Sequence, residues 1–195
     1  MTRTDEELML AVKQGDQMAF TELVNRHQRA LINFFYKFIW DKSLSEDYAQ
    51  EVFLKLFMHA NTYIPRAKFT TFMYRIARNH MIDRIRRNEA SKNTFSLETP
   101  LKDEETMLGT FIASSTPAPP EEICSKERSE IIKQALDQLP EHIKVVVVLS
   151  ETQGLMYSEI AEVLKVPLGT VKSRLHYGML KLKAILAETY KKTEN

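Results

Sequence analysis

Apolar residues recur at three- and four-residue spacing along most of this chain, which is the pattern of amphipathic helices. The clearest case is a long helix that ends near Trp40 and Asp41. Its apolar positions are Phe20, Leu23, Val24, His27, Ala30, Leu31, Phe34, Phe35 and Phe38. Alternation with period two, the signature of a half-buried strand, is almost absent. The pattern therefore predicts an all-α protein.

Capping signals place two further helices in the N-terminal half. Thr4 and Glu7 form a capping box for a short helix from Asp5 to Lys13. A second box, Ser43 with Glu46, predicts the start of a third helix. The apolar face of that third helix is Tyr48, Val52, Phe53, Leu56 and Phe57.

A fourth helix is expected from about Thr71 to about Glu89. The apolar positions at helical spacing there are Phe72, Ile76, Ala77, His80 and Ile85. Residues 61–92 contain eight Lys and Arg against two Asp and Glu, a net charge of +6 in a chain whose total is +1. A block of that density is either a binding surface for phosphate or a solvated helix face.

The helical pattern stops between about Ser91 and Pro120. This stretch contains four prolines, a Ser-Ser-Thr run and three consecutive acidic residues, a composition typical of a tether. Its apolar residues exceed what a spacer needs, so parts of it are expected to dock on a partner. They are Phe95, Leu97, Leu101, Met107, Leu108, Phe111 and Ile112. The expected organisation is an N-terminal domain 1–91, a flexible linker 92–124 and a C-terminal domain 125–190.

The C-terminal third predicts a helix-turn-helix. A helix face from Ile131 to Leu139 stops at Pro140, and the run Val145–Val148 is expected to be helical despite its β-branched side chains, because its flanks are helix-like. A short helix from Ser158 to Leu164 follows, then a turn through Val166 and a second helix that opens near Gly169 or Thr170. Such a second helix enters the major groove by its N-terminal turns, where Lys172, Ser173, Arg174 and His176 offer donors, acceptors and cations.

Three strings carry a family resemblance. Pro167–His176 (PLGTVKSRLH), preceded by Tyr157–Ala161 (YSEIA), closely resembles the C-terminal region of extracytoplasmic-function sigma factors of the bacterial sigma-70 family. Residues 46–54 (EDYAQEVFL) look like that family's polymerase-binding helix, and residues 69–84 (FTTFMYRIARNHMIDR) like its promoter-melting helix. Their order along the chain is the family's order, and the resemblance covers about residues 10–90 and 125–187.

The resemblance implies a sigma factor that brings RNA polymerase core to promoters and melts them without ATP, in response to stress and under an anti-sigma factor. The residues implied for polymerase binding are Asp47, Gln50, Glu51 and Leu54. Those implied for the downstream promoter element and its single strand are Asn61, Tyr63, Lys68, Arg75, Arg78, Asn79, Asp83, Arg84, Arg86 and Arg87. Those implied for the upstream element are Thr170, Lys172, Ser173, Arg174, His176 and Tyr177. Tyr63 is equally consistent with a core residue that closes its loop.

Two departures from the family pattern stand out. Phe72-Met73 replaces a common Trp-Leu pair, an apolar exchange that should preserve packing. Tyr177-Gly178-Met179 replaces a usual Arg-Ala-Arg, which removes two cations. Gly178 also costs about 1 kcal/mol of helix stability relative to alanine. Recognition of the upstream element is therefore expected to be weaker or differently specified.

The sequence argues against three other function classes. A sigma-like decoy that captures an anti-sigma factor would not need the basic block, and a helix-turn-helix regulator with a sensory domain would not need the polymerase-like string. An enzyme is not expected, since the five histidines lack metal-ligand spacing and neither a phosphate loop nor a nucleophile motif occurs. No cofactor or metal is expected. Without a secretory signal, a membrane span or a second cysteine beside Cys124, a cytoplasmic protein is expected.

Overall fold

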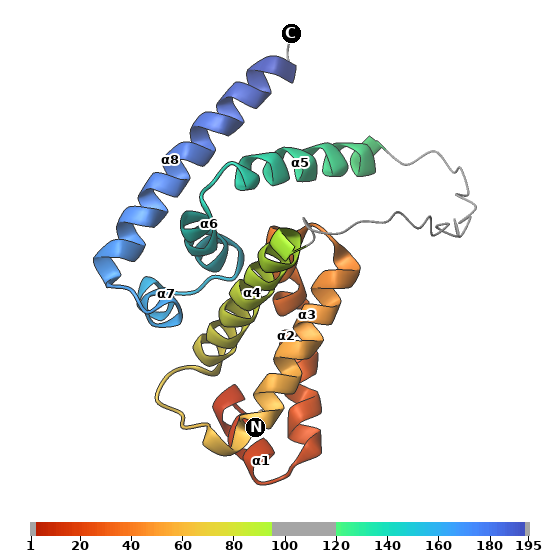
Figure 1. Cartoon of the computed structure of the whole chain (residues 1–195), viewed down its shortest axis with the longest axis vertical. Helices are drawn as coiled ribbons and strands as arrows, with labels where there is room; N and C mark the ends of the chain where they lie inside the picture. The colour runs from red at the N-terminus through yellow and green to blue at the C-terminus, as the bar shows by residue number, and fades with distance from the viewer. Residues whose placement is uncertain (1–2, 95–119, 194–195) are drawn as a thin grey trace, which may run out of the picture.

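The structure is a computed structural model that describes residues 3–94 and 120–193, with side chains described for 3–86 and 129–189. These parts of the chain form helices and contain no strand (Figure 1). The N-terminal helices are α1 (Asp5–Lys13), α2 (Gln17–Ile39), α3 (Lys42–Met58), the 3-10 turn η1 (Ala60–Thr62) and α4 (Phe69–Thr94). The C-terminal helices are α5 (Pro120–Asp137), α6 (Glu141–Val147), the π-helical turn η2 (Val148–Thr152), α7 (Tyr157–Leu164) and α8 (Leu168–Thr193). The predicted fold class is confirmed.

The helix starts in the N-terminal half follow their capping residues. The Thr4–Glu7 capping box is present at α1 as predicted. The start of α3 was predicted wrongly: Asp41, rather than Ser43, is the N-cap, and its side chain accepts a hydrogen bond from the Leu44 backbone N–H at 2.9 Å. Trp40 adopts a left-handed conformation (φ 57°), which ends α2 and lets α3 begin one residue after Asp41.

The apolar faces of the N-terminal helices meet in one core. Phe34, Phe35 and Leu23 of α2 are fully buried, together with Val52 of α3 and Met73 of α4. Phe57, predicted to be part of the α3 core face, is instead 49% exposed beside Phe20. The core face of α4 also lies partly elsewhere than predicted. Its fully buried apolar residues are Phe69, Met73, Tyr74, Ala77 and Met81, whereas Phe72, Ile76 and Ile85 are partly buried.

The helices bordering the expected linker extend into it. The backbone of α4 continues to Thr94 and that of α5 begins at Pro120, so both overlap the expected span 92–124. The apolar linker residues expected to dock on a partner, Phe95 to Ile112, lie outside the described residues.

The valine run is helical, as predicted. Val145, Val146 and Val147 end α6, and Val148 opens the π-helical turn η2. All four side chains are buried. Burial on every side explains the choice of residues, because β-branched side chains fill a core well even though they carry a small helix penalty.

The helix-turn-helix consists of α7 and α8. Lys165 closes α7 in the left-handed conformation (φ 55°), and α8 begins at Leu168. Val171 and Leu175 of α8 point into the core, as predicted. At Gly178, farther along α8, a Cβ atom would stand 2.7 Å from Val147 Cγ2 and 2.9 Å from Ile143 Cγ2. The glycine therefore permits a close crossing of α8 over α6.

The C-terminal unit packs against the N-terminal unit, with α7 alongside α4 (Figure 1). The Tyr74 hydroxyl donates to Gln153 Oε1 at 2.6 Å, and the Trp40 indole N–H donates to Asp137 Oδ1 at 2.9 Å. None of the helices within the described ranges is long and apolar enough to span a membrane.

Candidate nucleic-acid and polymerase interfaces

Three of the four residues predicted for polymerase binding form an exposed edge of α3. Asp47 and Gln50 are exposed, and Leu54 is 61% exposed one turn further along. The fourth residue, Glu51, is half-buried and forms an ion pair with Arg84 of α4. The structure therefore joins a residue predicted for polymerase with one predicted for DNA.

The Glu51–Arg84 pair belongs to a polar cluster between α3 and α4. The Arg84 guanidinium lies over the Tyr48 ring at 5.5 Å from its centroid. Beneath them His80 is buried, with Nδ1 2.9 Å from Lys55 Nζ and Nε2 3.6 Å from Glu51 Oε2. A donating ammonium at Nδ1 requires a neutral imidazole with its proton on Nε2. His80 is thus a structural residue of the α3–α4 interface.

The protonation of His80 is coupled to folding. Burial, and then the nearby Lys55 charge, lowers the pKa of His80 below its ordinary value of 6.5. The unfolded chain therefore takes up this proton at a higher pH than the folded chain, so His80 stabilises the fold above pH 6.5 and loses this contribution as pH falls through the lowered pKa. We expect the free energy of unfolding by urea to fall between about pH 7.5 and about pH 5.5, and His80→Phe to remove part of that fall. The same change at exposed His59 should leave the fall intact, and equal pH profiles for His80→Phe and the unchanged chain would refute the coupling.

The outer face of α4 presents polar residues predicted for promoter DNA. Asn79, Asp83 and Arg86 are exposed, and Arg75 lies over the Phe72 ring at 5.4 Å from its centroid. The backbone of Arg87 continues the same helix, while its side chain lies outside the described set. This face combines cations for phosphates with amide and carboxylate groups for base edges.

Arg78 lies at the border between the outer face of α4 and a groove. Its guanidinium donates to Asn79 Oδ1 at 3.3 Å. The groove has a volume of about 380 Å³ and separates α4 from α6. The lining residues are Arg78, Met81, Ile82, Ile85, Arg86, Glu141, His142 and Val145.

The loop between α3 and α4 holds the remaining predicted DNA residues. Asn61 is exposed, whereas the Tyr63 ring is only 3% exposed and packs against Phe72 at 5.2 Å between centroids. Of the two roles open for Tyr63, the buried one that closes the loop is the role this geometry supports. The Lys68 ammonium forms an ion pair with Glu159 of α7 at 2.8 Å, while the Lys68 side chain stays 60% exposed and open to DNA.

The front of α8 exposes most of the residues predicted for the upstream element. Lys172, Ser173 and His176 are exposed, and Tyr177 is 52% exposed. Thr170 and Arg174 are half-buried, and the Ser173 hydroxyl donates to the Thr170 carbonyl at 3.1 Å. The exposed set lies in the first turns of the second helix of the motif, where major-groove contacts are made.

Three residues that organise these surfaces escaped the sequence analysis in this role. Glu6 and Lys13 of α1 contact the two ends of the 63–69 segment, and Glu159 both accepts the Met156 N–H at 2.7 Å and pairs with Lys68. The signal for Glu159 is its position as third residue of α7, where acids cap helices. Glu6 and Lys13 have no local signal, because their partners are more than 45 residues away.

Comparison with known proteins identifies the family. Residues 23–91 match the family model of sigma-70 region 2, and residues 129–182 match that of sigma-70 region 4. The ECF RNA polymerase sigma factor SigW of Bacillus subtilis is 34% identical over 169 residues, which is 86% of this chain and 88% of SigW. The chain belongs to the sigma-70 family, in its extracytoplasmic-function group. The predicted resemblance is therefore confirmed.

Further relatives support this membership of the sigma-70 family. The RNA polymerase sigma-H factor of Pseudomonas aeruginosa is 31% identical, with 88% of each chain covered. Among solved structures, CnrH in complex with the cytosolic domain of CnrY matches with a TM-score of 0.70 and 20% identity, covering 95% of this chain and 99% of CnrH. The sigma factor RpoE of Bartonella quintana, in complex with the anti-sigma factor NepR, matches with a TM-score of 0.63 and 17% identity. The match covers 86% of this chain and 96% of RpoE. These two structures share the fold of this sigma-70 family member.

The curated relatives named above are RNA polymerase sigma factors. Among the residues that the structure describes, no three His, Cys, Asp or Glu side chains gather closely enough to hold a metal ion. The polar groups on the surfaces described above suit binding by charge and hydrogen bonds.

Proposed function

We propose that this chain directs RNA polymerase core to a set of promoters and opens the DNA there. The observation that carries the proposal is the separation of two exposed polar surfaces on one chain. The outer face of α4, a helix that packs against α3, offers Asn79, Asp83 and Arg86, and the front of α8 offers Lys172 and Ser173. One surface suits the melted downstream element next to polymerase, and the other suits a duplex major groove.

The residue roles follow the domain division. Asp47, Gln50 and Leu54 form the polymerase edge, with Glu51 shared between that edge and Arg84. Arg75 and Arg86 contact phosphates, and the 60–68 loop holds an unpaired base, whose release from the stack costs a few kcal/mol. Binding energy from these contacts, rather than ATP, drives melting.

We also propose that an anti-sigma factor controls this chain in the cytoplasm in response to stress. The Bartonella quintana protein that shares the fold is in complex with its anti-sigma factor. A groove with two arginines and apolar Met81, Ile82 and Ile85 would accept an amphipathic segment with acidic residues. The chain itself carries no catalytic role in this proposal.

Run-off transcription tests the function. Polymerase core is supplied with genomic promoter fragments, with and without the chain, and new transcripts are mapped at their 5′ ends. Promoter-dependent starts that need the chain are expected. Capture of an anti-sigma protein together with a complete lack of such starts would support a decoy instead.

The front of α8 is expected to set sequence preference at the upstream element. Because His176 is exposed and can offer a donor or an acceptor to a base edge, His176→Ala should change which base is preferred at one position, by about tenfold. Competition between promoter variants for the assembled holoenzyme measures this preference. Lys183→Ala, an exposed cation farther along α8, should leave the ranking unchanged, and an unaltered ranking for His176→Ala would remove His176 from the interface.

A further inference from the structure

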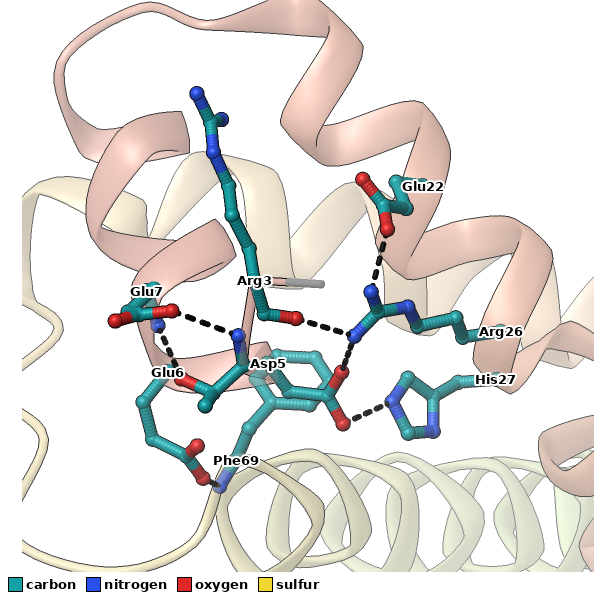
Figure 2. A network of polar contacts seen from close by, with 9 residues as sticks. Arg3, Asp5, Glu6, Glu7, Glu22, Arg26, His27 and Phe69 are labelled. Atoms are coloured by element: carbon teal, nitrogen blue, oxygen red, sulfur yellow. Dashed lines mark hydrogen bonds and ion pairs between the residues drawn. The ribbon is translucent and has the colours of Figure 1, made fainter. Parts of the chain in front are cut away.

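Helix α1 lies against the segment that connects α3 to α4, and residues 5–13 precede the part of the chain matched by the region 2 family model. Two of its side chains reach that segment. Lys13, at the end of α1, donates from Nζ to the Tyr63 carbonyl at 3.3 Å. Glu6, in its first turn, accepts the Phe69 backbone N–H at 2.7 Å (Figure 2). The two bonds hold the segment at its two ends.

Glu6 acts on the promoter-melting helix itself. Phe69 is the first residue of α4, and its backbone N–H is one of the donors that a helix start leaves without an internal partner. A carboxylate at that end also interacts favourably with the helix dipole. Glu6 thus supplies, from another helix and 63 residues away, the cap that local side chains usually provide.

The anchoring helix is itself firmly held on α2. Its apolar face, Leu8, Met9 and Val12, is buried. Figure 2 shows Arg26 between Asp5 and Glu22, with both carboxylates accepting from its guanidinium. His27 Nε2 lies 2.7 Å from the second oxygen of Asp5. Movement of α1 would therefore break a connected set of polar contacts as well as the core.

The spacing of its two contacts lets α1 restrict the segment from Tyr63 to Phe69. Glu6 and Lys13 lie seven residues apart, about 10 Å along the helix axis. The six peptide steps from Tyr63 to Phe69 could extend to roughly 20 Å. Two fixed ends therefore remove much of the conformational freedom of the exposed residues between them, among them Ile64 and Arg66.

Tyr63, which is buried at the start of this segment, also interacts with the first turn of α1. The Tyr63 hydroxyl is buried without a hydrogen-bond partner within the described residues. Burial, and then the charges of Glu6 and Asp5, raises the pKa of Tyr63 to about 12. Glu6 therefore acts on this segment twice, through its charge at Tyr63 and through its hydrogen bond to the Phe69 N–H.

We propose that α1 is a positioning element for single-strand capture. Lys13 and Glu6 hold the segment from Tyr63 to Phe69, and with it the 60–68 loop, in the conformation that accepts an unpaired promoter base. Neither residue contacts DNA in this role. The inference rests on the proposed function of the loop, and it extends that function to a helix outside both matched regions.

The test uses the full chain assembled with polymerase core. The probe is the non-template strand of a promoter that gives run-off transcript, as an oligonucleotide series with one abasic position in each member. For the unchanged chain, one abasic position should weaken binding about tenfold, as expected for a lost stacking or pocket contact. Glu6→Ala and Lys13→Met should each weaken binding of the intact strand about tenfold and reduce that abasic penalty below about twofold, because the pocket is no longer formed.

Conservative variants separate positioning from general stability. Glu6→Gln retains an acceptor for the Phe69 N–H, and Lys13→Arg retains a donor, so both should restore the abasic penalty. Glu7→Ala removes the capping box of α1 itself, which leaves Glu6 in place, and should retain the penalty. Affinity for polymerase core should be unchanged in every variant, since the α3 edge is untouched.

The possible outcomes separate the positioning role of α1 from the base-holding role of the loop. If no abasic position weakens binding of the unchanged chain, the loop does not hold a base, and both proposals fall. If the unchanged chain shows the penalty and Glu6→Ala and Lys13→Met retain it in full, the loop function stands and the role of α1 is overturned. An equal loss of core affinity and DNA affinity in these two variants would also overturn positioning, because it indicates unfolding.

Discussion

Asp47→Lys is expected to weaken assembly with RNA polymerase core by about 30-fold or more while the chain stays folded. Reversing a charge that faces a partner within an interface costs about 2 kcal/mol or more. Asp47 is exposed on α3, and among the described residues its carboxylate has no partner. A substitution there should change the free energy of unfolding by less than about 0.5 kcal/mol. Fluorescence titration of labelled chain with core measures the affinity, and urea unfolding checks the fold.

A matched charge reversal tests whether position, rather than charge alone, matters. Glu130 is exposed on α5, and Glu130→Lys changes the net charge by the same amount as Asp47→Lys. It should leave core affinity within about twofold, since exposed charges far from an interface are screened by salt. Wild-type affinity in Asp47→Lys would contradict the assignment of the α3 edge, and equal losses in both variants would indicate a non-specific charge effect.

Gly178→Val is expected to destabilise the C-terminal unit by about 3 kcal/mol, and Gly178→Ala by about 1 kcal/mol. Helix propensity alone predicts the opposite sign for alanine, a gain of about 1 kcal/mol. The crossing decides, because a Cβ would stand 2.7 Å from Val147 Cγ2 and 2.9 Å from Ile143 Cγ2. Both side chains are buried and β-branched, so neither can swing aside easily. Urea unfolding followed by circular dichroism measures the change.

A double variant tests the crossing directly. Val147→Ala removes the nearer methyl, so Gly178→Ala should cost less in that background than in the unchanged chain, a coupling of about 1 kcal/mol. Val163→Ala empties a different buried position of the same unit and should not rescue it. Additive costs in the Val147 background, or a stabilised Gly178→Ala chain, would contradict the close-packing account.

The close crossing of α8 over α6 also explains why glycine stands at position 178. From the sequence, Gly178 is predicted to lower helix stability. In the structure it lies where α6 leaves room for a hydrogen atom only. The large residues that face it, Ile143 and Val147, belong to α6 and lie more than 30 positions earlier. Gly178 and the valine run therefore depend on each other, because the bulk of Val147 leaves no room for a side chain at position 178. Residues so far apart in the sequence do not reveal this contact.

Much of the secondary structure follows from short-range rules. The capping box at Thr4 and Glu7, the apolar face of α2 and the inward positions Val171 and Leu175 depend on residues within a few turns of each other. The start of α3 was misplaced because Ser43 and Asp41 both offer a cap. The choice between them depends on Trp40, whose left-handed backbone ends α2 one residue before Asp41.

The sequence by itself determined the all-α class, the helix-turn-helix and the sigma-70 family, because helix periodicity, caps and motif strings are properties of neighbouring residues. Only the tertiary structure decided which polar groups are free. Arg84 is paired with Glu51, Lys68 with Glu159, and Glu6 with the Phe69 N–H, across 33 to 91 positions. Tyr63, which the sequence left between core and DNA, is buried. Such pairings depend on how helices dock, and a docking geometry is set by the summed packing of many side chains rather than by any local pattern.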